Sequence, residues 1–298
     1  MTTTAGSCGS EMTTRGGPPL FVACARVVLR LLLGTMSTFG DTASRWAARL
    51  AMAAPRRLWE GEPHVRARRI GLDFSLDLRD NVQRILYFTG YYERRYTRFL
   101  KKYLNKGDIY VDVGAHIGIH AMVMAKALAN LGGGEVFAFE ATEDSAMLLR
   151  EAARQNGLTN LAVETLALSS VTGEIPIYGD PEKFHSNDAA VRSFYGTGAP
   201  LALVQATTFD AWARARGAGV MDVVKIDVEG AEFAVLEGMR DSMAKHPPRI
   251  VGIEIRDYLL RRAGVDERQL RSILAEFGYE GRPRGNLDGN FIFERKDS

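Results

Sequence analysis

The sequence predicts an α/β fold in which a mostly parallel sheet is covered by helices on both faces. Strand-like and helix-like segments alternate from residue 108 to the last residues of the chain, and this alternation is typical of parallel strands joined by helical crossovers. Size supports the same fold class. With 298 residues and 46% hydrophobic side chains, the chain corresponds to one large domain, or one domain and an appendage, whose core needs no disulfide or metal.

Cysteine use and charge narrow the class of protein. Cys8 and Cys24, the two cysteines, both lie in the first tenth of the chain. We therefore expect neither a disulfide framework nor a zinc site, and the pattern fits a reducing, cytoplasmic setting. The formal charge is +2, but residues 1–70 hold ten arginines and four acids (+6), which leaves 2 − 6 = −4 for the rest. Because polyanions prefer a basic face, we expect no nucleic-acid partner.

Residues 1–65 are predicted to form an N-terminal arm. A Thr/Gly/Ser-rich lead (residues 1–19) is typical of disorder, and an apolar helix follows over residues 20–33. Arg26 and Arg30 interrupt its apolar run and share one helical face, so we interpret it as an amphipathic surface or docking helix. Reversible membrane contact and a signal segment are the alternatives. Asp41 is predicted to be the N-cap of a second helix that ends before Pro55.

The segment 66–107 leads into the core. Apolar residues alternate from Ile70 to Leu78, which predicts a half-buried strand, and residues 81–105 are predicted to be helical. Residues 108–298 then form the main domain, whose expected strands are Ile109–Val113, Glu135–Phe139, Leu161–Leu168, Glu174–Tyr178, Val220–Asp227, Ile250–Ile255 and Phe291–Glu294. Its expected helices are Ile119–Ala129, 143–155, Thr208–Ala215, Ala231–Ala244 and Glu267–Phe277. The loop 179–200, with His185, is interpreted as a lid or substrate loop.

A glycine-containing turn follows the first strand of this domain. Gly114 and Gly118 lie between Asp112 and the next helix, where ligands bind at the carboxyl ends of parallel strands. Their G-x-x-x-G spacing differs from the G-x-G-x-x-G of dinucleotide sites, and the chain contains no P-loop motif. Asp112 places a negative charge beneath the turn, which suits a ligand that carries an ammonium or sulfonium group.

Carboxylates end two further strands. Glu140 follows the second strand and is placed to accept the hydroxyl protons of a ribose; a helix N-cap role is the alternative. In the fourth strand, Lys225, Asp227 and Glu229 point to one side. A lysine inside a central strand needs a carboxylate partner, for which we predict Asp227 or Glu254. These groups form either a proton-handling site or a structural ion-pair network, in which Glu229 and Glu232 would serve the following helix.

The motifs together resemble the FkbM family of S-adenosylmethionine-dependent methyltransferases. The resemblance covers residues 88–294 and is carried by Gly90–Glu93, Asp112–Gly118, Glu140, Leu166–Leu168, Thr208–Asp210 and Lys225–Glu232. It implies a Rossmann-like class I methyltransferase fold with a seven-stranded sheet whose last strand is antiparallel. It also implies S-adenosyl-L-methionine as the cofactor, and methyl transfer to a hydroxyl of a sugar or small natural product.

The resemblance further implies a role for individual residues. The methionine part of the cofactor would contact Gly114 and Gly118, in the turn that Asp112 supports. Glu140 would bind the ribose, and Ala167 and Leu168 would lie near the adenine. Asp227 and Glu229 would face the sulfonium and the acceptor. His116, where the family often has asparagine, belongs to the same turn, and its side-chain contact stays open.

Methyl transfer to a hydroxyl requires a base, because the pKa of a sugar hydroxyl lies far above 7. We predict Asp227 or Glu229 in that role, with Lys225 orienting the carboxylate and Glu254 beside them. His116, His120 and His185 are alternative bases, although we expect His120 to be a packing residue. We expect no metal. A methyltransferase-shaped binding protein without turnover and a nicotinamide-dependent oxidoreductase are the competing functions. The sequence leaves the acceptor and the oligomeric state open.

Overall fold

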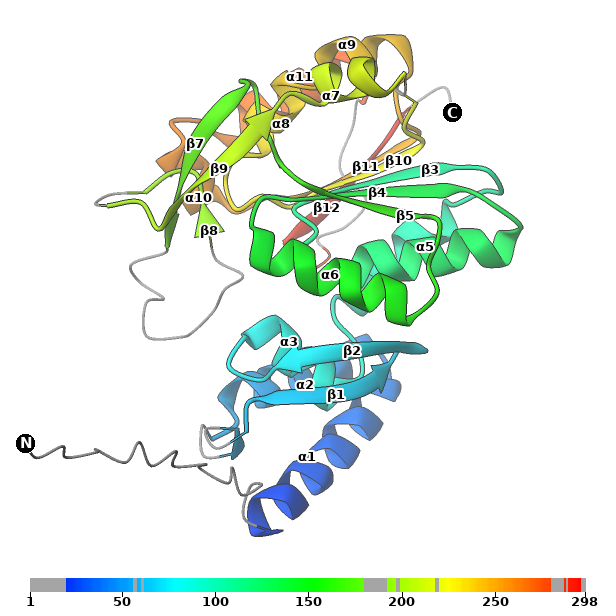
Figure 1. Cartoon of the computed structure of the whole chain (residues 1–298), viewed down its shortest axis with the longest axis vertical. Coiled ribbons are helices and arrows are strands. Elements are labelled where there is room, and N and C mark those ends of the chain that lie inside the picture. Colours follow the sequence, from blue (N-terminus) through cyan, green and yellow to red (C-terminus); the bar gives the residue numbers. More distant parts are fainter. Residues whose placement is uncertain are drawn as a thin grey trace, which may run out of the picture.

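The computed structural model describes residues 20–55, 58–59, 62–179, 192–196, 199–217, 220–279, 287 and 289–295. Figure 1 shows a central sheet between two layers of helices, a smaller sheet beside one end of it, and the N-terminal helices and hairpin beneath one helix layer. His185 and most of the predicted lid lie outside the described residues, as does the predicted disordered lead.

The central sheet confirms the predicted mostly parallel arrangement and its antiparallel last strand, but the expected strand Glu174–Tyr178 lies in the smaller sheet instead. The strands of the central sheet are β3 (Ile109–Val113), β4 (Glu135–Glu140), β5 (Leu161–Thr165), β10 (Val223–Ile226), β11 (Ile250–Glu254) and β12 (Asn290–Glu294). They lie in the order β12-β11-β10-β3-β4-β5, and all neighbours are parallel except β12, which is antiparallel to β11. The strand order reverses beside β3, so ligands are expected at its carboxyl end. The described residues supply six strands of this sheet, and residues 280–286, just before β12, are outside them.

Helices cover both faces of the central sheet, as predicted. They are α5 (Ile119–Leu131), α6 (Glu143–Gln155), α7 (Phe209–Arg216), α8 (Glu232–Glu237), α9 (Arg240–Lys245), α10 (Asp257–Arg262) and α11 (Glu267–Glu276). In Figure 1, α5 and α6 lie on one face and α7, α8, α9 and α11 on the other. Helix α5 is buried on most sides, which explains why its sequence is apolar almost all round.

Two features of this domain differ from the prediction. The expected helix Ala231–Ala244 is divided into α8 and α9 at Gly238, where a Cβ atom would lie 2.0 Å from the Ser169 carbonyl oxygen. Helix α10 was not predicted. The break at Gly238 allows the loop at Ser169 to approach the helix layer closely.

The smaller sheet is also only partly predicted. The expected strand Leu161–Leu168 is divided between β5 in the central sheet and β6 (Ala167–Leu168) in the smaller one. There β6 lies parallel to β9 (Ala202–Thr207), which pairs with β7 (Gly173–Gly179), and β7 pairs with β8 (Arg192–Ser193). Strand β9 follows the predicted lid 179–200, in a segment for which the sequence predicts no element. The apolar residues of β6 thus lie next to the edge of the central sheet.

The N-terminal region consists of α1 (Leu20–Thr38), α2 (Asp41–Ala53), β1 (His64–Arg69), β2 (Leu72–Asp77), α3 (Asn81–Thr89) and α4 (Arg94–Lys102). Three expectations need correction. Gly40, not Asp41, is the N-cap of α2. The strand expected from Ile70 starts at Leu72, because Ile70 and Gly71, both with positive φ, form the turn of a β1–β2 hairpin. The helix expected over 81–105 ends at Gly90, a left-handed C-cap, and restarts as α4.

The N-terminal elements share a hydrophobic core with α5. Buried side chains from α1, α2, the hairpin and α3, such as Leu33, Ala47, Leu72 and Leu86, belong to the same cluster as Met122. In the described part of the chain, no helix combines the length and the apolar character that crossing a membrane requires.

Candidate active site

A cavity of about 310 Å³ lies at the carboxyl ends of β3, β4, β10 and β11. Nine of the predicted site residues line it: Gly114, His116, Glu140, Ala167, Leu168, Lys225, Asp227, Glu229 and Glu254. The other two predicted site residues, Asp112 and Gly118, do not line the cavity. Met52 of α2 and Val82 and Ile85 of α3 also contribute to the lining. These N-terminal residues were not among the predicted site residues.

The glycine turn brings the backbone of β3 against β10. A Cβ atom on Gly114 would lie 1.8 Å from the Asp227 carbonyl oxygen, and one on Gly118 would lie 1.9 Å from Cδ1 of Leu149. Both residues have positive φ, at 79° and 80°. The Asp227 amide in turn donates to the Val113 carbonyl at 3.0 Å. Glycine at these positions therefore fixes the place of Asp227 at the edge of the cavity.

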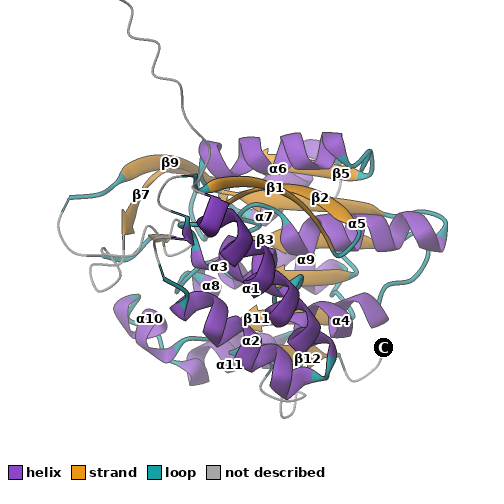
Figure 2. Cartoon of the chain, turned by 90° about the horizontal axis from the view of Figure 1, so that it is seen from below, coloured by secondary structure: helices purple, strands orange, loops and turns teal. Residues whose placement is uncertain are grey.

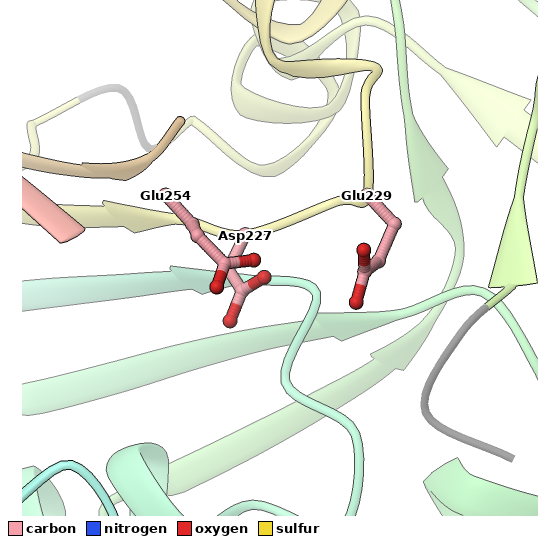
Figure 3. A group of neighbouring side chains, drawn as sticks. All are labelled: Asp227, Glu229 and Glu254. Carbon is pink, nitrogen blue, oxygen red and sulfur yellow. The ribbon is translucent and has the colours of Figure 1, made fainter. Parts of the chain in front are cut away.

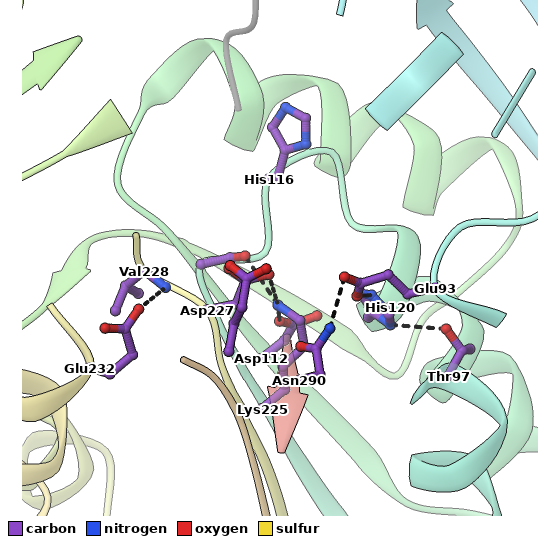
Figure 4. A network of polar contacts seen from close by, with 12 residues as sticks. Glu93, Thr97, Asp112, His116, His120, Lys225, Asp227, Val228, Glu232 and Asn290 are labelled. Atoms are coloured by element: carbon purple, nitrogen blue, oxygen red, sulfur yellow. Dashed lines mark hydrogen bonds and ion pairs between the residues drawn. The ribbon is translucent and has the colours of Figure 1, made fainter. Parts of the chain in front are cut away.

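Glu140 closes the other side of the turn. Its Oε2 accepts from the His116 amide at 2.9 Å, and its Oε1 accepts from the amide and the hydroxyl of Thr142 at 3.0 and 2.7 Å. Thr142, not Glu140, is the N-cap of α6. A carboxylate has about four lone-pair sites, so Glu140 retains acceptor capacity toward the cavity. The His116 side chain points away from Asp227 and Lys225 (Figure 4), and its Nε2 lies 3.7 Å from Oδ2 of Asp80.

Lys225 is the centre of a buried ion cluster. Its side chain is 2% exposed, and its Nζ lies 3.1 Å from Oδ1 of Asp112 and 3.3 Å from Oδ2 of Asp227 (Figure 4). Asp227 was one of the two partners predicted. The other expected partner, Glu254, instead pairs with Arg256 at 2.6 Å. Asp112 takes its place because β3 pairs with β10 in a register that sets Asp112 directly opposite Lys225.

Three carboxylates gather at the mouth of this cluster. Oxygen atoms of Asp227, Glu229 and Glu254 all lie within 4.8 Å of one another, as Figure 3 shows. Arg256 also lies 3.9 Å from Glu229. Oxygen ligands at this spacing suit a divalent cation, but Lys225 and Arg256 already neutralise much of their charge.

The pKa values of the Asp227 and Glu254 carboxyls are shifted in opposite directions. Burial, followed by the nearby Asp227 charge, raises the pKa of Glu254 well above its usual value. Burial alone would also raise the pKa of Asp227, but the Lys225 ammonium, a hydrogen bond from Glu254 and the Arg256 charge outweigh it and lower that pKa. Asp227 is therefore ionised at neutral pH, and the raised pKa of Glu254 favours the protonated form of the carboxyl beside it.

Glu93 was missed as part of the polar network. Its Oε2 lies 3.0 Å from His120 Nε2, and its Oε1 accepts from Asn290 Nδ2 at 2.9 Å (Figure 4). His120 Nδ1 lies 3.2 Å from the Thr97 hydroxyl. The predicted packing role of His120 agrees with its burial and its edge-to-face contact with the Tyr96 ring, yet it also lines the cavity. The signal for Glu93 was its place in the Gly90–Glu93 motif.

Glu232 serves the loop before α8 rather than the cavity. Its Oε1 accepts from the amides of Gly230 and Val228 at 3.0 and 3.4 Å. Burial raises the pKa of Glu232 to about 7 despite these bonds. This arrangement fits the structural alternative for that residue.

Comparison with known proteins identifies the family. The profile described as "Methyltransferase FkbM domain" matches residues 112–280, which is more than half of the chain. The protein belongs to the FkbM family of methyltransferases. It is therefore an S-adenosylmethionine-dependent enzyme, and the predicted family, class I fold and cofactor are confirmed.

Individual relatives are distant from this FkbM-family member. The hexuronic acid methyltransferase AglP of Haloferax volcanii is 26% identical over 226 residues, which are 76% of this chain and 85% of the relative. The ribosomal protein L11 methyltransferase of Thermotoga neapolitana is 39% identical over 75 residues, 25% of this chain and 27% of that protein. The crystal structure of methyltransferase FkbM from Methylobacillus flagellatus has a TM-score of 0.45 and 17% identity, and the match covers 64% of this chain and 44% of that one.

The cavity of this FkbM-family enzyme fits S-adenosyl-L-methionine in its chemistry. Gly114 has no room for a side chain, so the backbone forms the floor of the cavity there. Glu140 has acceptor capacity for hydroxyl groups. Leu168 and Phe194 give an apolar wall, and Asp227 supplies negative charge that complements a sulfonium.

Proposed function

We propose that the enzyme transfers a methyl group to a hydroxyl oxygen of a sugar-type acceptor. The observation that carries this proposal is the position of Asp227, an ionised carboxylate with a 22% exposed side chain at the cavity. The Haloferax volcanii relative is a hexuronic acid methyltransferase, which supports an acceptor of this class. An oxygen nucleophile needs such a base, whereas a thiolate or amine needs it less.

Asp227 is proposed to accept the proton of the acceptor hydroxyl. Lys225 holds one of its oxygens at 3.3 Å, and a hydrogen bond with the Glu254 carboxyl restrains it further. These contacts fix the carboxylate in one orientation, so little reorganisation is needed when the acceptor oxygen loses its proton. Glu229 lies at the same edge and is the second candidate base. Bound S-adenosylmethionine supplies a methyl carbon already activated by the sulfonium.

The cofactor-holding roles are proposals of the same kind. Gly114 and Gly118, in the turn above Asp112, would border the methionine part, with the His116 amide oriented by Glu140. Glu140 would also accept from the ribose hydroxyls. Ala167 and Leu168 of β6 would lie against the adenine, and the neighbouring Ile177 extends the same apolar wall.

The remaining partners follow from charge and exposure. We propose a small molecule or glycoside as the acceptor rather than a nucleic acid, because the segment beyond residue 70 is net acidic. The N-terminal arm is proposed to contact a membrane surface through the exposed apolar side chains of α1.

Mass spectrometry of candidate acceptors tests the proposal. The purified protein would be incubated with S-adenosylmethionine and either hexuronic acid glycosides or neutral glycosides, and products heavier by one CH₂ would be sought. The Asp227→Asn variant should lower kcat by about 10²- to 10⁴-fold and leave S-adenosylhomocysteine affinity nearly unchanged. Glu267→Gln, in the N-terminal turn of α11 where Glu267 pairs with Arg271, is the matched control. Cofactor binding without any methylated product would instead favour the non-catalytic binding protein.

A further inference from the structure

The outer surface of α1 and α2 presents an uncovered apolar face. Eight of the sixteen large apolar side chains that are exposed among the described residues lie within residues 27–52. Six of them define what we call the outer apolar face: Val27, Val28, Leu31, Leu32, Phe39 and Trp46. Their exposed fractions range from 45% for Val27 to 78% for Phe39. In Figure 2, α1 lies in the foreground, across the outside of α2 and α3.

Helix α1 leaves apolar side chains exposed and directs its arginines toward the protein. Arg26 is 5% exposed and donates through Nη2 to the Glu62 carbonyl at 2.8 Å and through Nε to the Leu58 carbonyl. Arg30 places its guanidinium over the Tyr87 ring at 5.8 Å. A surface helix in water keeps its polar stripe outside and its apolar stripe inside. Helix α1 instead buries Arg26 together with Leu33 and exposes apolar side chains, so its outer side is suited to an apolar environment.

We propose that the outer apolar face binds the surface of a membrane that contains anionic lipids. Of the four arginines of α1 and α2, Arg26 and Arg30 contact the protein, so the outer charge comes from α2. Arg45 and Arg49 are exposed on α2, and Arg49 lies over the Trp46 ring at 5.2 Å. Arginines attract anionic head groups, while tryptophan and the aliphatic side chains enter the boundary between head groups and acyl chains. The helices would thus lie in the plane of the membrane surface.

Charge favours a lipid surface over a second copy of the chain. In a symmetric dimer the same face meets itself, so the exposed Arg45 and Arg49 would add positive charge from both copies, and α1 has no acidic side chain to offset it. Like charges in contact weaken association. An anionic lipid surface offers the opposite charge over an extended area, so it complements the arginines and the apolar side chains at once.

Vesicle flotation and tryptophan fluorescence test this proposal on the full chain. The protein should float with vesicles of phosphatidylcholine and phosphatidylglycerol, and not with phosphatidylcholine alone. Of the three tryptophans, Trp59 and Trp212 are buried at 4% and 6% exposed, whereas Trp46 is 55% exposed. Vesicles should therefore shift the emission to shorter wavelength in the native protein and leave it unchanged in Trp46→Phe.

A matched pair of leucine variants separates the face from general stickiness. Leu31→Glu should weaken vesicle binding at least about tenfold, while Leu131→Glu, at an exposed leucine on α5, should leave it unchanged. Arg49→Gln should weaken binding to anionic vesicles about fivefold, since it removes one positive charge. Retained S-adenosylhomocysteine binding shows that each variant is folded, so a negative result here is distinguishable from failure of the proposed methyl transfer.

Three outcomes would overturn the proposal. They are no flotation of the native protein, equal flotation on neutral and anionic vesicles, or a lipid-free dimer that Leu31→Glu dissociates. The last outcome would assign the face to self-association instead.

Discussion

Replacing Lys225 by methionine should strongly destabilise the fold, because it leaves buried carboxylates without their cation. Lys225 is 2% exposed, and its partners Asp112 and Asp227 have side chains that are 0% and 22% exposed. Removing one member of a buried ion pair costs about 3–5 kcal/mol. At about 2–4 °C per kcal/mol for a protein of this size, Tm should fall by about 6–20 °C.

The loss of stability should depend on pH. In the native protein the pKa of Asp227 is lowered, so its ion pair stabilises the fold above its ordinary pKa and is lost as the pH falls. Without Lys225, the buried carboxylates must take up protons, and the variant should lose stability as the pH rises. The difference in Tm between native protein and variant should therefore be larger at pH 8 than at pH 5.

Thermal unfolding at the two pH values, with two further variants, decides the matter. Adding Asp112→Asn to Lys225→Met should restore part of the lost stability, since one buried charge is then removed as well. Lys101→Met, at an exposed lysine of α4, should change Tm little. If Lys225→Met behaves like Lys101→Met, or if its effect is the same at both pH values, the buried cluster does not hold these charges as argued.

Four other outcomes are expected. Gly114→Ala should abolish the thermal stabilisation by S-adenosylhomocysteine, about 2.7 kcal/mol at 100 times Kd, because its Cβ would lie 1.8 Å from the Asp227 carbonyl oxygen; full stabilisation would show that the turn can move. Glu254→Gln should retain most of the turnover and Glu254→Ala should lose it, since an amide also donates to Asp227; equal losses in both would make Glu254 the base itself. Because the pKa of Glu232 is raised to about 7, the unfolding free energy of the native protein should fall by on the order of 3 kcal/mol as the pH rises from about 4.5 to 7. Glu232→Gln should not show this fall, and parallel pH curves of unfolding free energy for the two proteins would contradict this. Chelation with EDTA should leave turnover unchanged, because Lys225 and Arg256 already neutralise the carboxylates; lost activity that Mg²⁺ restores would assign them as ligands.

The central sheet was predictable because its signals are local. Ile109–Val113 is a short apolar run between turn residues, and the structure places β3 over the same residues. The predicted span 143–155 likewise coincides with α6, whose first turn carries Glu143 and Asp144. Strand tips with glycines or acids then mark the cavity, since the carboxyl ends of parallel strands share one edge. Sequence order thus fixes which side chains meet there.

The errors lie where long-range contacts decide local structure. The chain between Ala231 and Ala244 has continuous helical periodicity, yet Gly238 packs against Ser169 of a distant loop and the helix is divided there. Strand β9 was missed because its pattern is weak, and its pairing with β7 stabilises it. Residues close in the sequence predict neither the contact of Gly238 with Ser169 nor the pairing of β9 with β7.

The active site shows the same limit, with a consequence for function. Asp227 reaches its place through the local KIDVEG segment, but Glu93, His120 and Asn290 come from three elements that only the fold brings together. Asn290 lies on β12, directly opposite Glu254 in the strand register. The Glu93 network thus joins the N-terminal region to the strand that positions the Asp227–Glu254 pair. A change in how α3 and α4 pack should therefore alter the position of Asp227, the proposed base, even though the family match begins only at residue 112.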